Sequence, residues 1–367
     1  MENRFLKPRA VCIGGAGMTR RIAIGGGAPV SVQTMWKKGI SAVACDDRLL
    51  EGVLDEIESL RKLGCDILRF AVPDGQSAAA LVKIAARTEM PLVADIHFDY
   101  RLALACLEGN VAAIRINPGN IGRRERVEEV VAACREKGTA IRIGVNSGSL
   151  PKDLNALVAG GTLSRAAALS EAAAREAAVF DELHFSDVVV SMKASSVSET
   201  IEANERFAQK YDIPLHIGVT EAGPLVSGIV KSTLAFSALL REGIGSTIRV
   251  SLSSSPENEV ITGREILREC GLRRGGVSIV SCPRCGREGF DVHGFVERWQ
   301  NELFSLDKDI TVAVMGCVVN GPGEGRHADI GIAGSGSKAV IFKKGKIVRT
   351  IDAQDADKLF REELNSL

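Results

Sequence analysis

The stretch "AAIRINPGNIGRRERVEEVVAACREKGTAIRIGVN", residues 112–146, reads as a strand, a helix and a second strand. Short apolar runs rich in β-branched residues open and close it, and the apolar residues between them recur at helical spacing. Eight such runs fit a (β/α)8 TIM-type barrel, which takes about 250 residues, whereas a doubly wound open sheet would stop at about five or six strands. The runs begin at Val30, Ile67, Leu92, Ala112, Ala140, Asp187, Leu215 and Ser246.

The rest of the 367 residues lies before and after this barrel. The glycine-rich segment 14–32 predicts a hairpin that closes the lower end of the barrel, and it matches a phosphate loop poorly because no lysine or helix follows its glycines. After a hinge at "GLRRGG", residues 271–276, the pattern changes to that of a small α+β domain. We therefore expect a barrel over residues 1–272 and a second domain over residues 273–367.

Composition argues against several classes of protein. Forty-six basic and 46 acidic residues cancel, so no overall field attracts the chain to nucleic acid or a membrane, and an anion must be bound by a local cluster. No apolar run approaches the roughly 18 residues of a membrane span, and the first 15 residues lack the apolar core of a signal peptide. We expect a cytoplasmic protein whose nine cysteines are buried thiols or metal ligands and not disulfides.

Three cysteines stand out by their spacing. "SCPRCG" holds Cys282 and Cys285 in a C-x-x-C turn that lets two sulfurs converge on one metal centre, and Cys317 ends another strand of the same domain. A zinc site would need a second pair of ligands, and a redox pair would not need Cys317. An iron–sulfur cluster needs a fourth ligand, and Glu324, one turn beyond Cys317, is the candidate. Three thiolates and one weaker oxygen would leave one iron able to exchange its ligand for a substrate.

The other six cysteines are isolated in the sequence. We interpret them as structural: Cys12, Cys45, Cys65, Cys106, Cys134 and Cys270.

Polar side chains recur at alternate positions along the predicted strands, where they share one face. Five of them are cations from five different strands: Arg69, Arg115, Arg142, Lys193 and Arg249. Because these charges would repel one another across a narrow barrel mouth, they predict a ligand with several negative charges, and a diphosphate suits the guanidinium fork. The other polar residues at such positions are Gln33, Asp95, His97, Asn117, Asn146, His216, Thr220, Glu221 and Ser251.

Seven short motifs resemble the bacterial 4-hydroxy-3-methylbut-2-enyl diphosphate synthase family of non-mevalonate isoprenoid synthesis. They are "SCPRCGR", "AVMGCVVNGPGE", "ADIGIAG", "GVNSGSL", "SMKAS", "GVTEAG" and "RVSL", and the similarity runs over essentially the whole chain. One segment departs from the family: residues 36–47, "WKKGISAVACDD", replace the usual Thr- and Asn-rich residues after the first strand. From that strand only Gln33 and Thr34 are therefore carried over.

The resemblance implies a reaction and the residues that perform it. The family converts 2-C-methyl-D-erythritol 2,4-cyclodiphosphate to 4-hydroxy-3-methylbut-2-enyl diphosphate by reductive ring opening and loss of water. A [4Fe-4S] cluster would be bound by Cys282, Cys285, Cys317 and Glu324, and Glu221 would join Glu324 as a catalytic residue. The expected substrate-binding residues are Gln33, Thr34, Arg69, Asp95, His97, Arg115, Asn117, Arg142, Asn146, Lys193, His216, Arg249 and Ser251.

The resemblance also implies partners. Flavodoxin or ferredoxin would deliver two electrons, one at a time, and the barrel of one chain would meet the cluster domain of the other in a homodimer, because the hinge is too short for the small domain to reach its own barrel mouth. Two rival functions stay open: a pterin-binding transferase whose second domain holds zinc, and a non-catalytic iron–sulfur scaffold. The brown colour of a cluster would distinguish it from zinc, and a mere carrier would not need five cations at a barrel mouth.

Overall fold

The computed structural model describes residues 4–283, 290–317, 325–335 and 338–367. The chain divides into two compact units, Met1–Arg273 and Arg274–Leu367. The boundary falls within the segment 271–276 that the sequence marks as a hinge. The predicted Cys285 and Glu324 lie outside the described residues.

The first unit contains a sheet of eight parallel strands, in the order β8-β7-β6-β5-β4-β3-β10-β9. A parallel bridge between Val190 of β8 and Leu215, the residue before β9, joins the two ends of this order, so the sheet closes into a barrel. The predicted (β/α)8 barrel is confirmed, and each predicted run contains one strand. The strands are β3 Ser31–Met35, β4 Ile67–Ala71, β5 Leu92–Asp95, β6 Ala113–Ile116, β7 Ala140–Asn146, β8 Val188–Lys193, β9 His216–Ile217 and β10 Thr247–Ile248.

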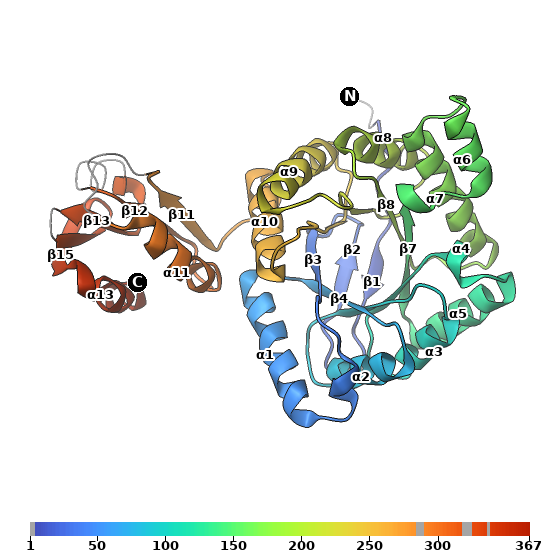
Figure 1. The fold of residues 1–367 in the computed structure, drawn as a ribbon, viewed down its shortest axis with the longest axis horizontal. Coiled ribbons are helices and arrows are strands. Elements are labelled where there is room, and N and C mark those ends of the chain that lie inside the picture. Colours follow the sequence, from blue (N-terminus) through green and yellow to red (C-terminus); the bar gives the residue numbers. More distant parts are fainter. Residues whose placement is uncertain (1–3, 284–289, 318–324, 336–337) are drawn as a thin grey trace. The chain divides into compact units, whose positions relative to one another are not determined.

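Helices surround the strands on the outside of the barrel (Figure 1). Local sequence sets their ends: the Asp46 side chain accepts the N–H of Arg48 where α1 begins, and Gly64, at φ 104°, ends that helix in the left-handed conformation that glycine adopts without strain. The helices are α1 Asp47–Leu63, α2 Gly75–Ala85, α3 Tyr100–Leu107, α4 Pro118–Ile121, α5 Arg124–Lys137, α6 Lys152–Ala159, α7 Arg165–Glu182, α8 Val197–Ala208, α9 Leu225–Arg241 and α10 Pro256–Glu269.

An antiparallel hairpin precedes the barrel, with β1 Val11–Ile13 paired to β2 Ile22–Ile24. Its apolar side chains pack in one buried cluster with residues that begin barrel strands, among them Ile67, Ala113 and Ala140. The hairpin therefore closes the N-terminal end of the barrel, as its sequence predicts, and leaves the C-terminal end as the mouth.

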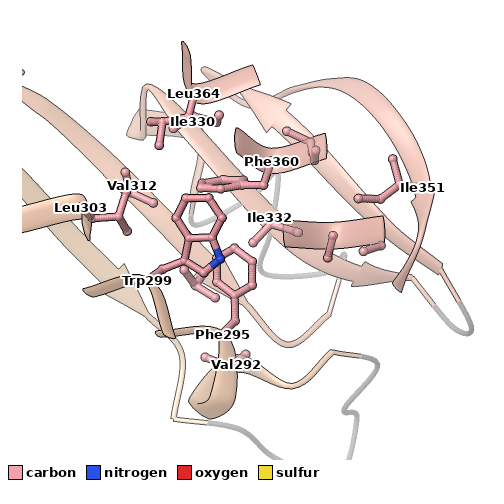
Figure 2. Packing of buried hydrophobic residues seen from close by; sticks show 14 of the residues in the cluster. Val292, Phe295, Trp299, Leu303, Val312, Ile330, Ile332, Ile351, Phe360 and Leu364 are labelled. Carbon is pink, nitrogen blue, oxygen red and sulfur yellow. The ribbon is translucent and has the colours of Figure 1, made fainter. Parts of the chain in front are cut away.

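The second unit is a five-stranded sheet in the order β11-β12-β13-β14-β15, parallel from β11 to β13 and antiparallel from β13 to β15. Phe295, Trp299 and Phe360 make up the aromatic centre of its core, with ring centroids 5.1 to 5.5 Å apart (Figure 2). The elements are β11 Val277–Ser281, α11 Val292–Phe304, β12 Ile310–Met315, β13 Ile330–Ser335, β14 Lys338–Lys343, β15 Lys346–Asp352 and α13 Ala356–Asn365.

Replacing Phe295, which is fully buried, with Ala should lower the free energy of unfolding of the small unit by about 3–5 kcal/mol, because the loss of the ring leaves a cavity. Urea unfolding followed by the fluorescence of Trp299 measures the change in a Trp36→Phe background, since the chain has 2 tryptophans. Val348→Ala is the control, because Val348 is 44% exposed. Equal midpoints for the two variants would contradict this account of the core.

Candidate functional site

A cavity of about 190 Å³ lies at the C-terminal ends of the barrel strands. Met35, Asp95, Asn146 and Lys193 are the last residues of their strands, so the lining forms a ring around the mouth. All five predicted cations line it. The full lining is Met35, Arg69, Asp95, His97, Arg115, Arg142, Asn146, Ser191, Lys193, Thr220, Arg249 and Ser251.

Asp95 holds two of the cations. Its Oδ1 accepts a hydrogen bond from Arg115 Nη1 at 3.0 Å, and its Oδ2 lies 3.5 Å from Arg69 Nε. Burial alone would raise the pKa of this carboxyl, but Arg69, His97 and Arg115 outweigh burial and hold the pKa well below its usual range. Asp95 is therefore a permanent anion in the lining of the cavity.

The Arg115 side chain crosses the neighbouring strand β7 at Gly144. Its Nη2 donates to the Gly144 carbonyl at 3.3 Å, and a Cβ on Gly144 would lie 2.4 Å from both Nε and Nη2 of Arg115. The absence of a side chain at Gly144 thus makes room for the guanidinium. Arg142 is held differently: its Nη1 donates to Gln33 Oε1 at 2.5 Å.

Lys193 is held by a neutral partner. Its Nζ lies 3.1 Å from His216 Nε2, and His216 Nδ1 lies 2.7 Å from Thr247 Oγ1. When Lys193 is charged its ammonium group can only donate, and His216 then accepts through Nε2 and carries its proton on Nδ1. Burial, together with the charge of Lys193, lowers the pKa of His216 well below its ordinary value, which agrees with a neutral imidazole.

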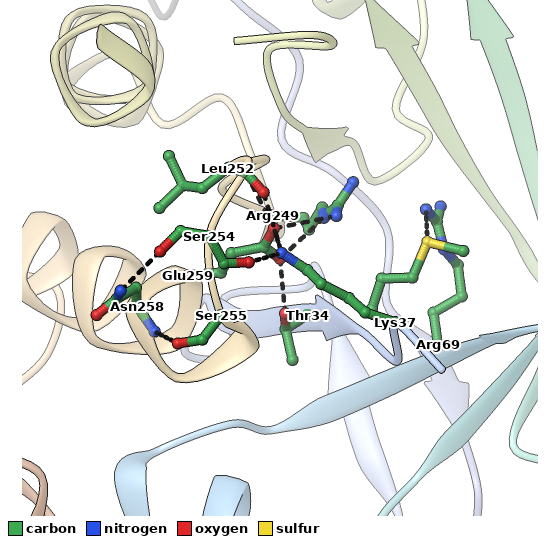
Figure 3. Close-up of polar contacts among 10 residues, drawn as sticks. Thr34, Lys37, Arg69, Arg249, Leu252, Ser254, Ser255, Asn258 and Glu259 are labelled. Carbon is green, nitrogen blue, oxygen red and sulfur yellow. Dashed lines mark hydrogen bonds and ion pairs between the residues drawn. The ribbon is translucent and has the colours of Figure 1, made fainter. Parts of the chain in front are cut away.

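Arg249 is held by Glu259, a residue of α10 that is 1% exposed. Arg249 Nε and Nη2 lie 3.3 and 3.2 Å from the two carboxylate oxygens. Glu259 also accepts from Thr34 Oγ1 at 2.7 Å and pairs with Lys37 at 3.0 Å (Figure 3). The strand-based prediction missed Glu259 because it lies on a helix, and its only sequence signal is an acidic residue in the first helical turn, where the helix dipole favours it.

The gathered cations are costly without an anion. Burial, opposed by Asp95, lowers the pKa of Arg69 to about 10. Burial and the neighbouring arginines also lower the pKa values of Arg142 and Lys193 well below their ordinary values. A guanidinium stays protonated in proteins, so for Arg69 and Arg142 the shift expresses the cost of the buried charge, which a bound anion would offset.

The predicted polar residues fall into two groups. Asp95, His97, Asn146, Thr220 and Ser251 line the cavity with the cations. Four others lie outside the lining: Gln33, Thr34 and His216 contact Arg142, Glu259 and Lys193, and Asn117 accepts the Gly119 N–H at the start of α4. Met35 and Ser191 line the cavity without having been predicted, although strand alternation places Ser191 on the same face as Lys193.

Glu221 is an exposed residue within the "GVTEAG" motif, residues 218–223. Its φ is 50°, a left-handed conformation that is rare for a residue with a side chain. Thr220, directly before it, lines the cavity. Such strain is common at functional sites, so Glu221 stays a candidate for a reacting group.

In the small unit, Cys282 and Cys317 follow two neighbouring parallel strands. Ser281 of β11 is paired with Val314 of β12, so both cysteines leave the sheet at the same edge. The Gly316 N–H donates to Cys282 Sγ at 3.0 Å. Within the described ranges no three or more metal-ligating side chains gather. These two half-buried thiols fit the thiolate ligands of an iron–sulfur cluster.

The six other cysteines differ in burial. Burial raises the pKa values of Cys65, Cys106 and Cys134 to about 12, as expected for inert structural thiols. Cys12 and Cys270 are half-buried. Cys45 is exposed, so the expectation of a buried thiol is wrong there, because the residue ends a short 3-10 helix on the barrel surface.

No helix in the part of the chain that the structure describes is both long and apolar enough to cross a membrane. The fold and the mouth define a class: a TIM-barrel protein whose mouth is lined by five cations, joined to a small α+β domain. The GcpE TIM-barrel domain matches residues 16–264, and the GcpE protein C-terminal domain matches residues 278–366. The chain therefore belongs to the GcpE family.

Curated relatives agree with this assignment. A protein of Treponema pallidum (strain Nichols) is 59% identical over 98% of this chain and 92% of its own length. One of Treponema denticola is 55% identical over the whole of both chains, and one of Clostridium perfringens is 48% identical over 91% and 93%. All three are named 4-hydroxy-3-methylbut-2-en-1-yl diphosphate synthase (flavodoxin).

Gly144→Ala should displace the Arg115 guanidinium and weaken binding of inorganic diphosphate about tenfold, or about 1.4 kcal/mol. Isothermal titration calorimetry measures the affinity. Gly148→Ala is the matched control, because a Cβ there meets nothing within 4 Å. An unchanged affinity in Gly144→Ala would show that the position of Arg115 does not matter for the anion.

Proposed function

We propose that this protein catalyses the reductive ring opening and dehydration of 2-C-methyl-D-erythritol 2,4-cyclodiphosphate to 4-hydroxy-3-methylbut-2-enyl diphosphate. The reaction takes up two electrons and two protons and releases one water. The observation that carries the proposal is the cavity into which five strands bring five cations, in a chain of the GcpE family. A pterin-binding transferase and a non-catalytic scaffold are not favoured, because the curated relatives carry the name of a diphosphate synthase.

In this proposal the cations of the mouth bind the diphosphate. Arg69, Arg115, Arg142, Lys193 and Arg249 supply the positive charge, and Asn146 and Ser251 add hydrogen bonds. Charge-assisted contacts of this kind are the strong ones, and the guanidinium groups can grip phosphate oxygens in pairs. Asp95 pairs with both Arg69 and Arg115 and orients the two guanidinium groups.

Two further carboxylates take part in the proposed chemistry. Glu221, next to the cavity-lining Thr220, would transfer a proton near the reacting carbons. Glu324 would be the exchangeable ligand of the cluster, a role that rests on the sequence motif because the residue lies outside the described ranges.

The proposed cofactor is a [4Fe-4S] cluster held by Cys282, Cys285, Cys317 and Glu324. When bound, the cluster would supply the electrons singly and a Lewis-acidic iron for the leaving oxygen. The support from this chain is the shared sheet edge of Cys282 and Cys317 and the Gly316 N–H on the Cys282 sulfur. A reducing cytoplasm, which keeps such thiols free of disulfides, suits this assignment.

The electron donor and the assembly are part of the same proposal. The relatives' printed names specify flavodoxin, so a flavodoxin, or a ferredoxin of similar size, is the proposed donor. The short hinge supports a homodimer in which the barrel of one chain and the cluster domain of its partner complete one site.

Cys282→Ser and Cys317→Ser should each abolish the cluster's visible absorption and the turnover of the cyclodiphosphate by anaerobically purified protein with a strong one-electron reductant, because each removes a thiolate ligand. Cys45→Ser, which changes an exposed thiol, should keep both. Full cluster content in Cys317→Ser would contradict the assignment of Cys317 as a cluster ligand. Brown protein that does not convert the cyclodiphosphate would support the cluster assignment but refute the proposed reaction.

Mixing two inactive variants tests the dimer. Arg142→Ala and Cys282→Ser, combined under conditions that exchange subunits, should regain up to about a quarter of wild-type turnover, because half of the dimers would then hold one intact site out of two. The unmixed variants are the controls. A mixture that stays inactive after verified exchange would mean that each site forms within one chain.

A further inference from the structure

Lys37 belongs to the segment that departs from the family resemblance, and its ammonium group lies against Glu259 and two backbone carbonyls although its side chain is 31% exposed. Its Nζ donates to the Leu252 carbonyl at 3.0 Å and lies 3.0 Å from Glu259 Oε1. It also donates to the Ser254 carbonyl. Figure 3 shows the ammonium group at the centre of these contacts. The next residue, Lys38, instead pairs with Glu56 at 2.6 Å, and its side chain is 67% exposed.

Lys37 and Arg249 share one carboxylate oxygen. Glu259 Oε1 lies 3.0 Å from Lys37 Nζ and 3.2 Å from Arg249 Nη2, and it accepts the Leu252 N–H at 3.0 Å. The other oxygen accepts from Thr34 at 2.7 Å and from Arg249 Nε at 3.3 Å. A carboxylate offers about four lone-pair sites, so these donors saturate Glu259.

The charges of this group do not cancel. Glu259 carries one negative charge against the two positive charges of Lys37 and Arg249. Asp95 likewise carries one negative charge against the two positive charges of Arg69 and Arg115. Without Lys37, Arg249 and Glu259 would form a neutral pair. A neutral pair attracts an anion less than a group that keeps one net positive charge.

We propose that Lys37 is a positioning residue for anion binding at the mouth. By sharing Glu259 it leaves Arg249, which lines the cavity, with uncompensated positive charge, and it fixes the carboxylate that orients the guanidinium. The inference rests on the proposed function, in which that anion is the substrate diphosphate. The segment after the first strand therefore contributes to the mouth through a lysine, although it lacks the polar residues usual in the family.

In the alternative, Lys37 serves only as a hydrogen-bond donor to the backbone, and its charge plays no part. A variant that keeps the donor but removes the charge distinguishes the two roles. Lys37→Gln keeps an N–H donor for the carbonyls of Leu252 and Ser254 but removes the charge. We expect it to weaken binding of inorganic diphosphate about five- to tenfold, because Glu259 would then compensate the charge of Arg249 fully. Lys37→Arg should recover most of the affinity, and Lys38→Gln is the matched control.

The experiment is calorimetric titration of the anaerobically purified whole protein with inorganic diphosphate, with thermal unfolding of each variant measured alongside. A lowered melting temperature with unchanged affinity in Lys37→Gln would overturn the inference in favour of the role as a hydrogen-bond donor to the backbone. So would equal affinities of Lys37→Gln and Lys38→Gln while Arg249→Ala loses binding. Wild-type protein that does not bind inorganic diphosphate would overturn the proposed function, and this inference with it.

In a Glu259→Gln background the shared carboxylate is gone, so the added effect of Lys37→Gln should fall below twofold. An effect as large as that in the wild-type background would show that Lys37 acts independently of Glu259, and it too would overturn the inference.

Discussion

Mutual repulsion among the mouth cations is the constraint on which the rest of the barrel site depends. Buried like charges are tolerated only when carboxylates, dipoles or a ligand compensate them. Two buried carboxylates do so here: Asp95 between Arg69 and Arg115, and Glu259 behind Arg249. Neither cancels its partners' charge, so the mouth stays positive while each side chain stays in place.

The barrel supplies the geometry that makes this possible. Parallel strands end together at one face of a TIM barrel, so single residues from several strands can meet there without long loops. The β1–β2 hairpin covers the opposite end with an apolar cluster that includes Val11, Ile13 and Ile24. All five cations line the cavity at the other end, where an anion can enter.

Much of the barrel could be predicted because buried parallel strands read as short apolar runs, and alternation along those runs located all five cations. The sequence could not reveal partners that come from other elements. Glu259 lies on helix α10, and Lys37 lies in the segment 36–47, whose residues depart from those usual in the family. Thr34 and His216 have the strand positions of lining residues, yet they are fully buried against Glu259 and Lys193. In the small unit, the shared edge of Cys282 and Cys317 depends on the register of β11 and β12, which spacing alone does not fix.

Two glycines make room for the long side chains of cations at the mouth. Gly144 lies under Arg115 from the preceding strand, and Gly218 lies under Lys193, with a Cβ there only 2.9 Å from Lys193 Cε. Neither glycine has a positive φ, so space and not backbone freedom explains them. Both stand in an Ile-Gly-Val sequence, "RIGVN" and "HIGVT". A glycine at an inward position of a barrel strand therefore indicates where a long cation from the preceding strand crosses, and this signal connects residues that simple alternation treats separately.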